Sequence, residues 1–194
     1  MWTIPNQITL FRIVLIPIFL IIFYLPLSWS NFGAFAVFWL AAISDILDGY
    51  LARKLNQSSA FGAFIDPVAD KLMVVVALVM IAQDYSSWLV SIAAIIMIAR
   101  EVFISALREF MSSRGKRNVI AVSNMGKYKT AAQMLGIMGL IWQPSYDIPL
   151  ILFYLPHEVI NYLSYGFYFI ATVLTVTTWV SYFKAAWPEL KGEK

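Results

Sequence analysis

The chain has 194 residues, of which 61% are hydrophobic and only 13% are charged. A soluble domain of this length carries about a quarter charged residues, so the composition favours the lipid bilayer as the solvent. The net charge is +3, but the basic residues are distributed over several loops, which argues against nucleic acid as a partner. The chain has no cysteine and no basic start before a short apolar run, so neither a disulfide nor a cleaved signal peptide is expected.

Six stretches are apolar and long enough to cross a bilayer, which takes a helix of roughly 20 residues. They cover residues 7–27, 32–52, 61–82, 88–110, 125–142 and 159–182. Residues 144–156 are also apolar but contain three prolines. We expect that segment to be a short re-entrant or interfacial piece, or the start of the last helix. No internal repeat is present, so the sequence predicts one all-α integral membrane domain over residues 1–194, with six transmembrane helices.

Lysine and arginine indicate the orientation of these helices. They occur in the 53–60 loop, in the 111–124 loop and in the tail, whereas the 24–33, 83–88 and 143–158 segments have none. Cytoplasmic loops are the ones enriched in basic residues. The pattern therefore predicts that both termini are cytoplasmic.

Four aspartates lie inside two of the predicted spans: Asp45 and Asp48 in the second, and Asp66 and Asp70 in the third. Each carboxylate costs about 2.5–3.5 kcal/mol at the centre of a membrane, so the group needs a compensating partner. The spacings of three and four residues place each pair on one helix face. Because a short loop joins the two helices, they run antiparallel, and the four carboxylates are expected to meet at the cytoplasmic mouth of the bundle.

Four carboxylates in one place favour a metal site. Hard oxygen ligands suit Mg²⁺ or Mn²⁺, and four of them can bridge two ions. Two alternatives stay open from the residues alone, namely a set of buried salt bridges and the ion path of a cation transporter. Gly49, Ala52 and Gly62 lie near the same faces and permit close approach of a ligand or of another helix. Arg53 can offer a planar fork to phosphate.

These residues form one continuous pattern: Asp45-Ile-Leu-Asp48-Gly49-Tyr-Leu-Ala52-Arg53, eight residues, Gly62, three residues, Asp66, three residues and Asp70. The pattern matches D-x2-D-G-x2-A-R-x8-G-x3-D-x3-D in full, and the chain therefore resembles the CDP-alcohol phosphatidyltransferase family. Residues 4–12 and 66–71 resemble the bacterial branch that uses sn-glycerol 3-phosphate. The resemblance implies the CDP-alcohol phosphotransferase fold, a homodimer, and an inner-membrane enzyme whose active site faces the cytoplasm.

The resemblance also implies a role for each residue. The ligands of two divalent cations, Mg²⁺ or Mn²⁺, would be Asp45, Asp48, Asp66 and Asp70. Asp70 would in addition be the general base that takes the proton of the acceptor hydroxyl. The residues along the donor, CDP-diacylglycerol, would be Gly49, Ala52, Arg53 and Gly62, supported by Asn6, Thr9 and Arg12. Helix capping or a snorkelling arginine explains those last three about as well.

The fourth span and the loop after it contain a candidate acceptor site. Arg100, Arg108 and Lys127 together would hold a phosphate dianion, and the resemblance points to the same three positions for sn-glycerol 3-phosphate. A structural pairing of Arg100 with Glu101 is the alternative. A serine acceptor is disfavoured because it has no phosphate, but an inositol phosphate stays open. His157 is expected to be a structural or surface residue.

Overall fold

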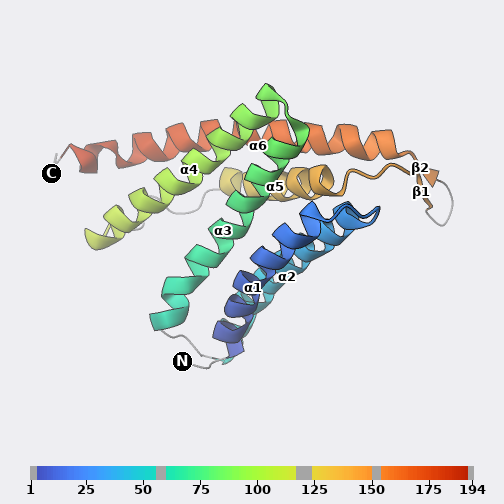
Figure 1. Ribbon diagram of the computed structural model, residues 1–194. Coiled ribbons are helices and arrows are strands. Elements are labelled where there is room, and N and C mark those ends of the chain that lie inside the picture. Colours follow the sequence, from blue (N-terminus) through green and yellow to red (C-terminus); the bar gives the residue numbers. More distant parts are fainter. Residues whose placement is uncertain (1–3, 56–59, 117–123, 150–153, 192–194) are drawn as a thin grey trace. The chain divides into compact units, whose positions relative to one another are not determined.

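The computed structural model describes residues 4–55, 60–116, 124–149 and 154–191. In this part of the chain the helices are α1 Ile4–Tyr24, α2 Ser30–Leu55, α3 Ala60–Tyr85, α4 Trp88–Ser113, α5 Asn124–Trp142 and α6 His157–Leu190 (Figure 1). Two short strands, β1 Ile148–Pro149 and β2 Tyr154–Leu155, pair antiparallel. A helix lies over each of the six predicted spans, so the all-α class is confirmed, although α1 ends at Tyr24, three residues before the end predicted for the first span.

The strands β1 and β2 lie in the proline-rich segment 144–156, and its re-entrant or interfacial position stays a prediction. The alternative that the last helix begins there is wrong, because α6 begins at His157. Asp147 explains this start: its Oδ1 accepts the backbone N–H of His157 at 3.0 Å, which satisfies a donor that the first turn leaves unpaired. The Nδ1 atom of His157 lies 2.9 Å from the same oxygen, and the hydrogen bond with His157 lowers the pKa of Asp147.

Four of the helices, α1, α2, α4 and α6, are long and apolar enough to cross a membrane. Large apolar side chains on them are exposed, such as Ile21 at 63%, Ile95 at 63% and Val173 at 62%. Such surfaces suit contact with lipid rather than water. The chain is therefore a membrane-embedded protein. Six spans with cytoplasmic termini stay a prediction, because α3 and α5 are not among these four helices.

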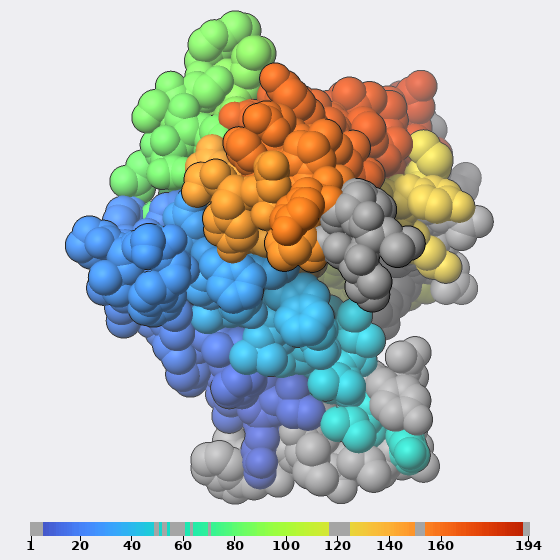
Figure 2. Space-filling model, turned by 90° about the vertical axis from the view of Figure 1, so that its right-hand side faces the viewer, coloured from blue at the N-terminus to red at the C-terminus, as the bar shows by residue number. Residues whose placement is uncertain are grey.

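The chain divides into two compact units, so the single domain stays a prediction as well. The first comprises Met1–Met80 and Met138–Asn161. Here α1 packs along α2, and the buried rings of Phe19 and Phe38 lie 6.3 Å apart. Figure 2 shows the α1 and α2 side chains forming one continuous surface on this face. At the end of α5, the Trp142 ring stacks on Phe35 at 5.2 Å.

The second unit comprises Ile81–Ile137 and Tyr162–Lys194. Its buried cluster joins α4 to α6 through Ile104, Leu107, Met111, Tyr182 and Ala186. The fully buried Tyr168 of α6 donates its hydroxyl to the carbonyl oxygen of Val90 at 3.1 Å. On α5, Gly136 lies directly against Tyr168, since a Cβ atom at Gly136 would come within 2.7 Å of the Tyr168 backbone nitrogen. These contacts hold α4, α5 and α6 together within the unit.

Gly136→Ala should destabilise the protein, because backbone rather than a movable side-chain tip occupies the space that the methyl group needs. Forcing an extra carbon into a packed core costs about 1–3 kcal/mol. Gly166→Ala on α6 is the matched control, since a Cβ there meets nothing within 4 Å. Thermal unfolding in detergent should show a lower Tm for Gly136→Ala and no loss for Gly166→Ala. Equal Tm values would show that α5 shifts without cost.

Candidate active site

The aspartates of the signature meet residues of α1 at one end of the first unit. Thr9 and Arg12 lie in the first half of α1, Asp45 and Asp48 in the last half of α2, and Asp66 near the start of α3. Figure 1 shows the start of α1, the end of α2 and the start of α3 at the same end of this unit. The antiparallel arrangement expected for α2 and α3 is what brings their carboxylates together.

Arg12 bridges two of the aspartates. Its Nη1 donates to Asp45 Oδ1 at 2.7 Å and its Nη2 donates to Asp48 Oδ2 at 2.5 Å. The side chains of Arg12 and Asp48 are 4% and 8% exposed, whereas that of Asp45 is 47% exposed. A buried carboxylate needs a partner of opposite charge with good geometry, and the rigid guanidinium fork reaches both carboxylates at once.

Thr9 extends the group to the third helix. Its hydroxyl oxygen lies 2.5 Å from Asp66 Oδ1 and 3.3 Å from Asp48 Oδ2. Thr9 is one helical turn before Arg12, so both side chains lie on the same face of α1. The buried Asn6 lies one turn earlier still. The helices α1, α2 and α3 therefore meet through side chains that are polar and largely buried.

The residues present fit a divalent metal. The oxygens of Asp45, Asp48, Asp66 and Thr9 are the hard donors that Mg²⁺ and Mn²⁺ prefer. With Arg12 counted, the three carboxylates leave a charge of −2, which a divalent cation would balance. The side chains of Gly49, Ala52, Arg53 and Asp70 lie outside the described ones. Gly62 is buried in α3 near Asp66 in the sequence.

The pairing of Arg12 with Asp45 and Asp48 was missed by the sequence reasoning, which weighed a nucleotide-binding role against snorkelling. The sequence does contain a signal for this pairing, because Arg12 is the only lysine or arginine in the apolar residues 7–27. A buried cation in one span and buried anions in the next are expected to pair. Arg12 is the cation that the structure brings to Asp45 and Asp48.

The second unit contains the arginines of the candidate acceptor site. The guanidinium carbons of Arg100 and Arg108 each lie 5.8 Å from the centre of the Tyr182 ring, within the range of a cation–π contact. Arg100 is 7% exposed, and its buried Nε has no hydrogen-bond partner. Arg108 is exposed. The two arginines therefore converge on one tyrosine, with donors left for an anionic ligand.

An ion-pair network adjoins these arginines. Arg100 Nη1 donates to Glu101 Oε1 at 3.1 Å, and the buried Lys129 of α5 pairs with the same oxygen. The pairing of Arg100 with Glu101, the structural alternative, is thus present. Among the described contacts none joins Lys127 to either arginine, and Lys127 is exposed on α5. Lys129, which the sequence analysis did not single out, is therefore the α5 lysine whose described contact joins the Arg100–Glu101 pair.

A third group of titratable residues lies beside the hairpin. Ligand atoms of Asp147, His157 and Glu158 all lie within 4.8 Å of one another. Two of these residues are exposed, and capping of α6 by Asp147 already explains their proximity. His157 therefore has the structural role expected for it, as a partner of Asp147.

The comparisons with known proteins agree with the signature. The family model for CDP-alcohol phosphatidyltransferase matches residues 2–184, and the chain belongs to this family. Relatives from Escherichia coli (strain K12) and Shigella flexneri are each 46% identical over 189 residues, covering 97% of this chain and 97% of the relative. Both relatives are named CDP-diacylglycerol–glycerol-3-phosphate 3-phosphatidyltransferase. The resemblance inferred from the sequence is confirmed.

Arg12→Lys should lower activity by about 10–100-fold, the usual cost of removing a group that orients metal ligands. A lysine keeps the charge, but its N–H donors all lie on one nitrogen and cannot reproduce the planar fork by which Nη1 and Nη2 reach different carboxylates. The half-saturating Mn²⁺ concentration should therefore rise as well. Val14→Ala, at an exposed position of the same helix, is the control and should behave as the unchanged protein. A normal rate and a normal Mn²⁺ requirement in Arg12→Lys would remove Arg12 from the site.

Proposed function

We propose that the chain transfers the phosphatidyl group of CDP-diacylglycerol to sn-glycerol 3-phosphate, giving phosphatidylglycerophosphate and CMP. The observation that carries this proposal is the side-chain group of Thr9, Arg12, Asp45, Asp48 and Asp66, of which Thr9, Arg12 and Asp48 are buried. These aspartates belong to the family signature and converge from two helices on α1. The printed names of the relatives from Escherichia coli and Shigella flexneri supply the particular donor and acceptor.

Two divalent cations, Mg²⁺ or Mn²⁺, are part of the proposal. Asp45, Asp48, Asp66 and Asp70 would hold them. When bound, the cations supply positive charge next to the diphosphate and favour departure of CMP. Arg12 would keep Asp45 and Asp48 oriented, and Thr9 would do the same for Asp66. Loss of such an orienting partner typically costs about 10–100-fold in metal affinity or activity.

The chemistry assigned to the chain's own residues is proton transfer and positioning. Asp70 would accept the proton of the acceptor hydroxyl, whose oxygen then attacks the phosphorus that carries diacylglycerol. The bond from that phosphorus to the oxygen of CMP breaks, and CMP leaves. Positioning of the two substrates accounts for most of the rate. The residues proposed to lie along the CDP portion are Asn6, Thr9, Gly49, Ala52, Arg53 and Gly62.

The acceptor's phosphate is assigned to Arg100, Arg108 and Lys127. The unpaired Nε of Arg100 and the exposed guanidinium of Arg108 support this assignment, because charge-assisted hydrogen bonds from arginine suit phosphate. Glu101 pairs with Arg100 and with Lys129, so it would hold these two basic side chains in place. We also propose that the enzyme is a homodimer in the bacterial inner membrane with its site facing the cytoplasm. The distribution of basic residues supports that orientation.

An acceptor screen tests the proposed reaction. Purified protein with labelled CDP-diacylglycerol and Mg²⁺ or Mn²⁺ should release CMP and form a labelled lipid with sn-glycerol 3-phosphate. Serine and glycerol should give little product, because they have no phosphate for the arginines to bind. Inositol phosphate should also give little product, because its hydroxyls lie on a ring and not on a glycerol chain. Asp70→Asn should insert normally and give no product. Turnover with the other alcohols but not with sn-glycerol 3-phosphate would overturn the acceptor assignment, and turnover by Asp70→Asn would remove Asp70 as the base.

Arg108→Ala should raise the KM for sn-glycerol 3-phosphate by about 10–100-fold, since a hydrogen bond to a charged group contributes about 1.5–3 kcal/mol. The KM for CDP-diacylglycerol should change little. Arg114→Ala is the matched control, because Arg114 also lies at the end of α4 and stacks on an aromatic ring, that of Phe110. Initial rates at varied concentrations of each substrate give both constants. A change confined to the donor's KM would contradict the acceptor site.

A further inference from the structure

An apolar groove runs along the C-terminal half of α6. Its volume is about 490 Å³, and it is lined by Trp179, Val180, Phe183, Lys184 and Trp187. The spacing of these residues by one, four, five and eight positions places them on one side of the helix. All except Lys184 are apolar or aromatic. The groove is therefore apolar, with one positively charged side chain among the residues that line it.

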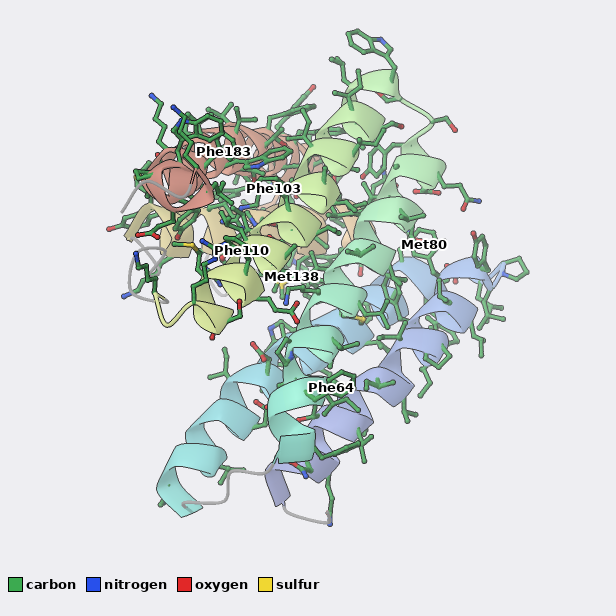
Figure 3. All side chains as sticks on the ribbon, turned by 90° about the vertical axis from the view of Figure 1, so that its left-hand side faces the viewer. Phe64, Met80, Phe103, Phe110, Met138 and Phe183 are labelled. Atoms are coloured by element: carbon green, nitrogen blue, oxygen red, sulfur yellow. The ribbon has the colours of Figure 1, made fainter. Side chains whose placement is uncertain are left out.

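The aromatic walls of the groove are fixed by packing within the second unit. Phe103 of α4 lies 5.5 Å from the Trp179 ring and 6.0 Å from the Phe183 ring, between ring centres. Figure 3 shows Phe103 and Phe183 side by side. The rings of Phe183 and Trp187 lie 5.2 Å apart. Val180 and Trp187 are nonetheless 47% and 45% exposed, so the groove opens outward from a helix long enough to span the membrane.

The charge beside this groove is positive. Lys184 lines it, and Lys191 Nζ lies 5.5 Å from the centre of the Trp187 ring. Glu189 is the nearest acid along the helix, but it pairs with Lys116 at 2.5 Å. Among the residues that the structure describes, none of those lining the groove is a carboxylate. An occupant with an apolar body and a negative head would complement both properties of the groove.

We propose that this groove binds one anionic phospholipid of the surrounding bilayer. An acyl chain lies among Trp179, Val180 and Phe183, and the lipid phosphate lies at Lys184. Tryptophan and lysine both favour the level of the headgroups, where the aromatic ring is half in hydrocarbon and the amine reaches the phosphate. A basic side chain at this level contributes about 1 kcal/mol of attraction to anionic lipid.

A second copy of the chain fits the groove less well. Two copies meeting through this face would bring two Lys184 side chains together with no carboxylate among the lining residues. A lipid phosphate brings the opposite charge with it. The groove also shares no residue with the aspartate group or with Arg100, Arg108 and Lys127. Lipid binding is therefore independent of the proposed reaction and can be measured in protein that does not turn over.

Native mass spectrometry of the full chain, released from micelles with equal phosphatidylglycerol and phosphatidylcholine, tests the proposal. The unchanged protein should retain one phosphatidylglycerol per chain in preference to phosphatidylcholine. Lys184→Gln should reduce that preference about fivefold, which corresponds to about 1 kcal/mol. Val180→Trp should fill the groove and lose the bound lipid. Val173→Trp makes the same change two turns earlier on α6, at a residue outside the groove, and should retain the lipid.

Three outcomes would overturn the proposal. Equal retention of the two lipids would show that the groove has no preference for negative charge. Preferential retention that survives in both Lys184→Gln and Val180→Trp would place the lipid elsewhere on the protein. A shift from dimer to monomer in Val180→Trp, without a change in bound lipid, would show that a second copy occupies the groove. The same spectra report the mass of the assembly and therefore separate these outcomes.

Discussion

The fork of Arg12 between Asp45 and Asp48 is the interaction on which the first unit depends. Each of these charges would be costly if it stood alone in an apolar helix. Together they form a pair of short ion bridges that join α1 to α2, and Thr9 carries the connection on to Asp66 of α3. The group has more negative than positive charge. The arrangement that stabilises the contacts between the helices therefore also suits the binding of a divalent cation.

Much of this organisation could be predicted from the sequence. Long apolar stretches located all six helices, because a helix is the way to satisfy backbone groups in lipid. The spacing of Asp45, Asp48 and Asp66 predicted that they would meet, since period and loop length determine which faces oppose each other. The side chains that pair with these aspartates could not be predicted in the same way. Which cation reaches Asp48 depends on the rotation and depth of α1, which its nearly uniform apolar pattern does not specify.

The contacts of the candidate acceptor site could be predicted only in part for the same reason, namely that the sequence does not specify how a helix is rotated. Arg100 and Arg108 are two turns apart on α4, so their shared contact with Tyr182 follows from helix geometry. The choice between Lys127 and Lys129 depends on how α5 is rotated against α4. These lysines are two residues apart and so point about 200° away from each other. Lys129 is the one buried beside Glu101. The β1–β2 hairpin was likewise hidden, because three prolines in a short apolar stretch suit several irregular conformations.

The position of Arg12 in the chain has a consequence for biogenesis. Because α1 is synthesised before α2, the guanidinium is already present when Asp45 and Asp48 leave the ribosome. A helical hairpin of α1 and α2 can then enter the bilayer as one unit, with its opposite charges neutralising each other during transfer. The order of the residues along the chain thus lets the protein insert two acids into a membrane before any metal ion is bound.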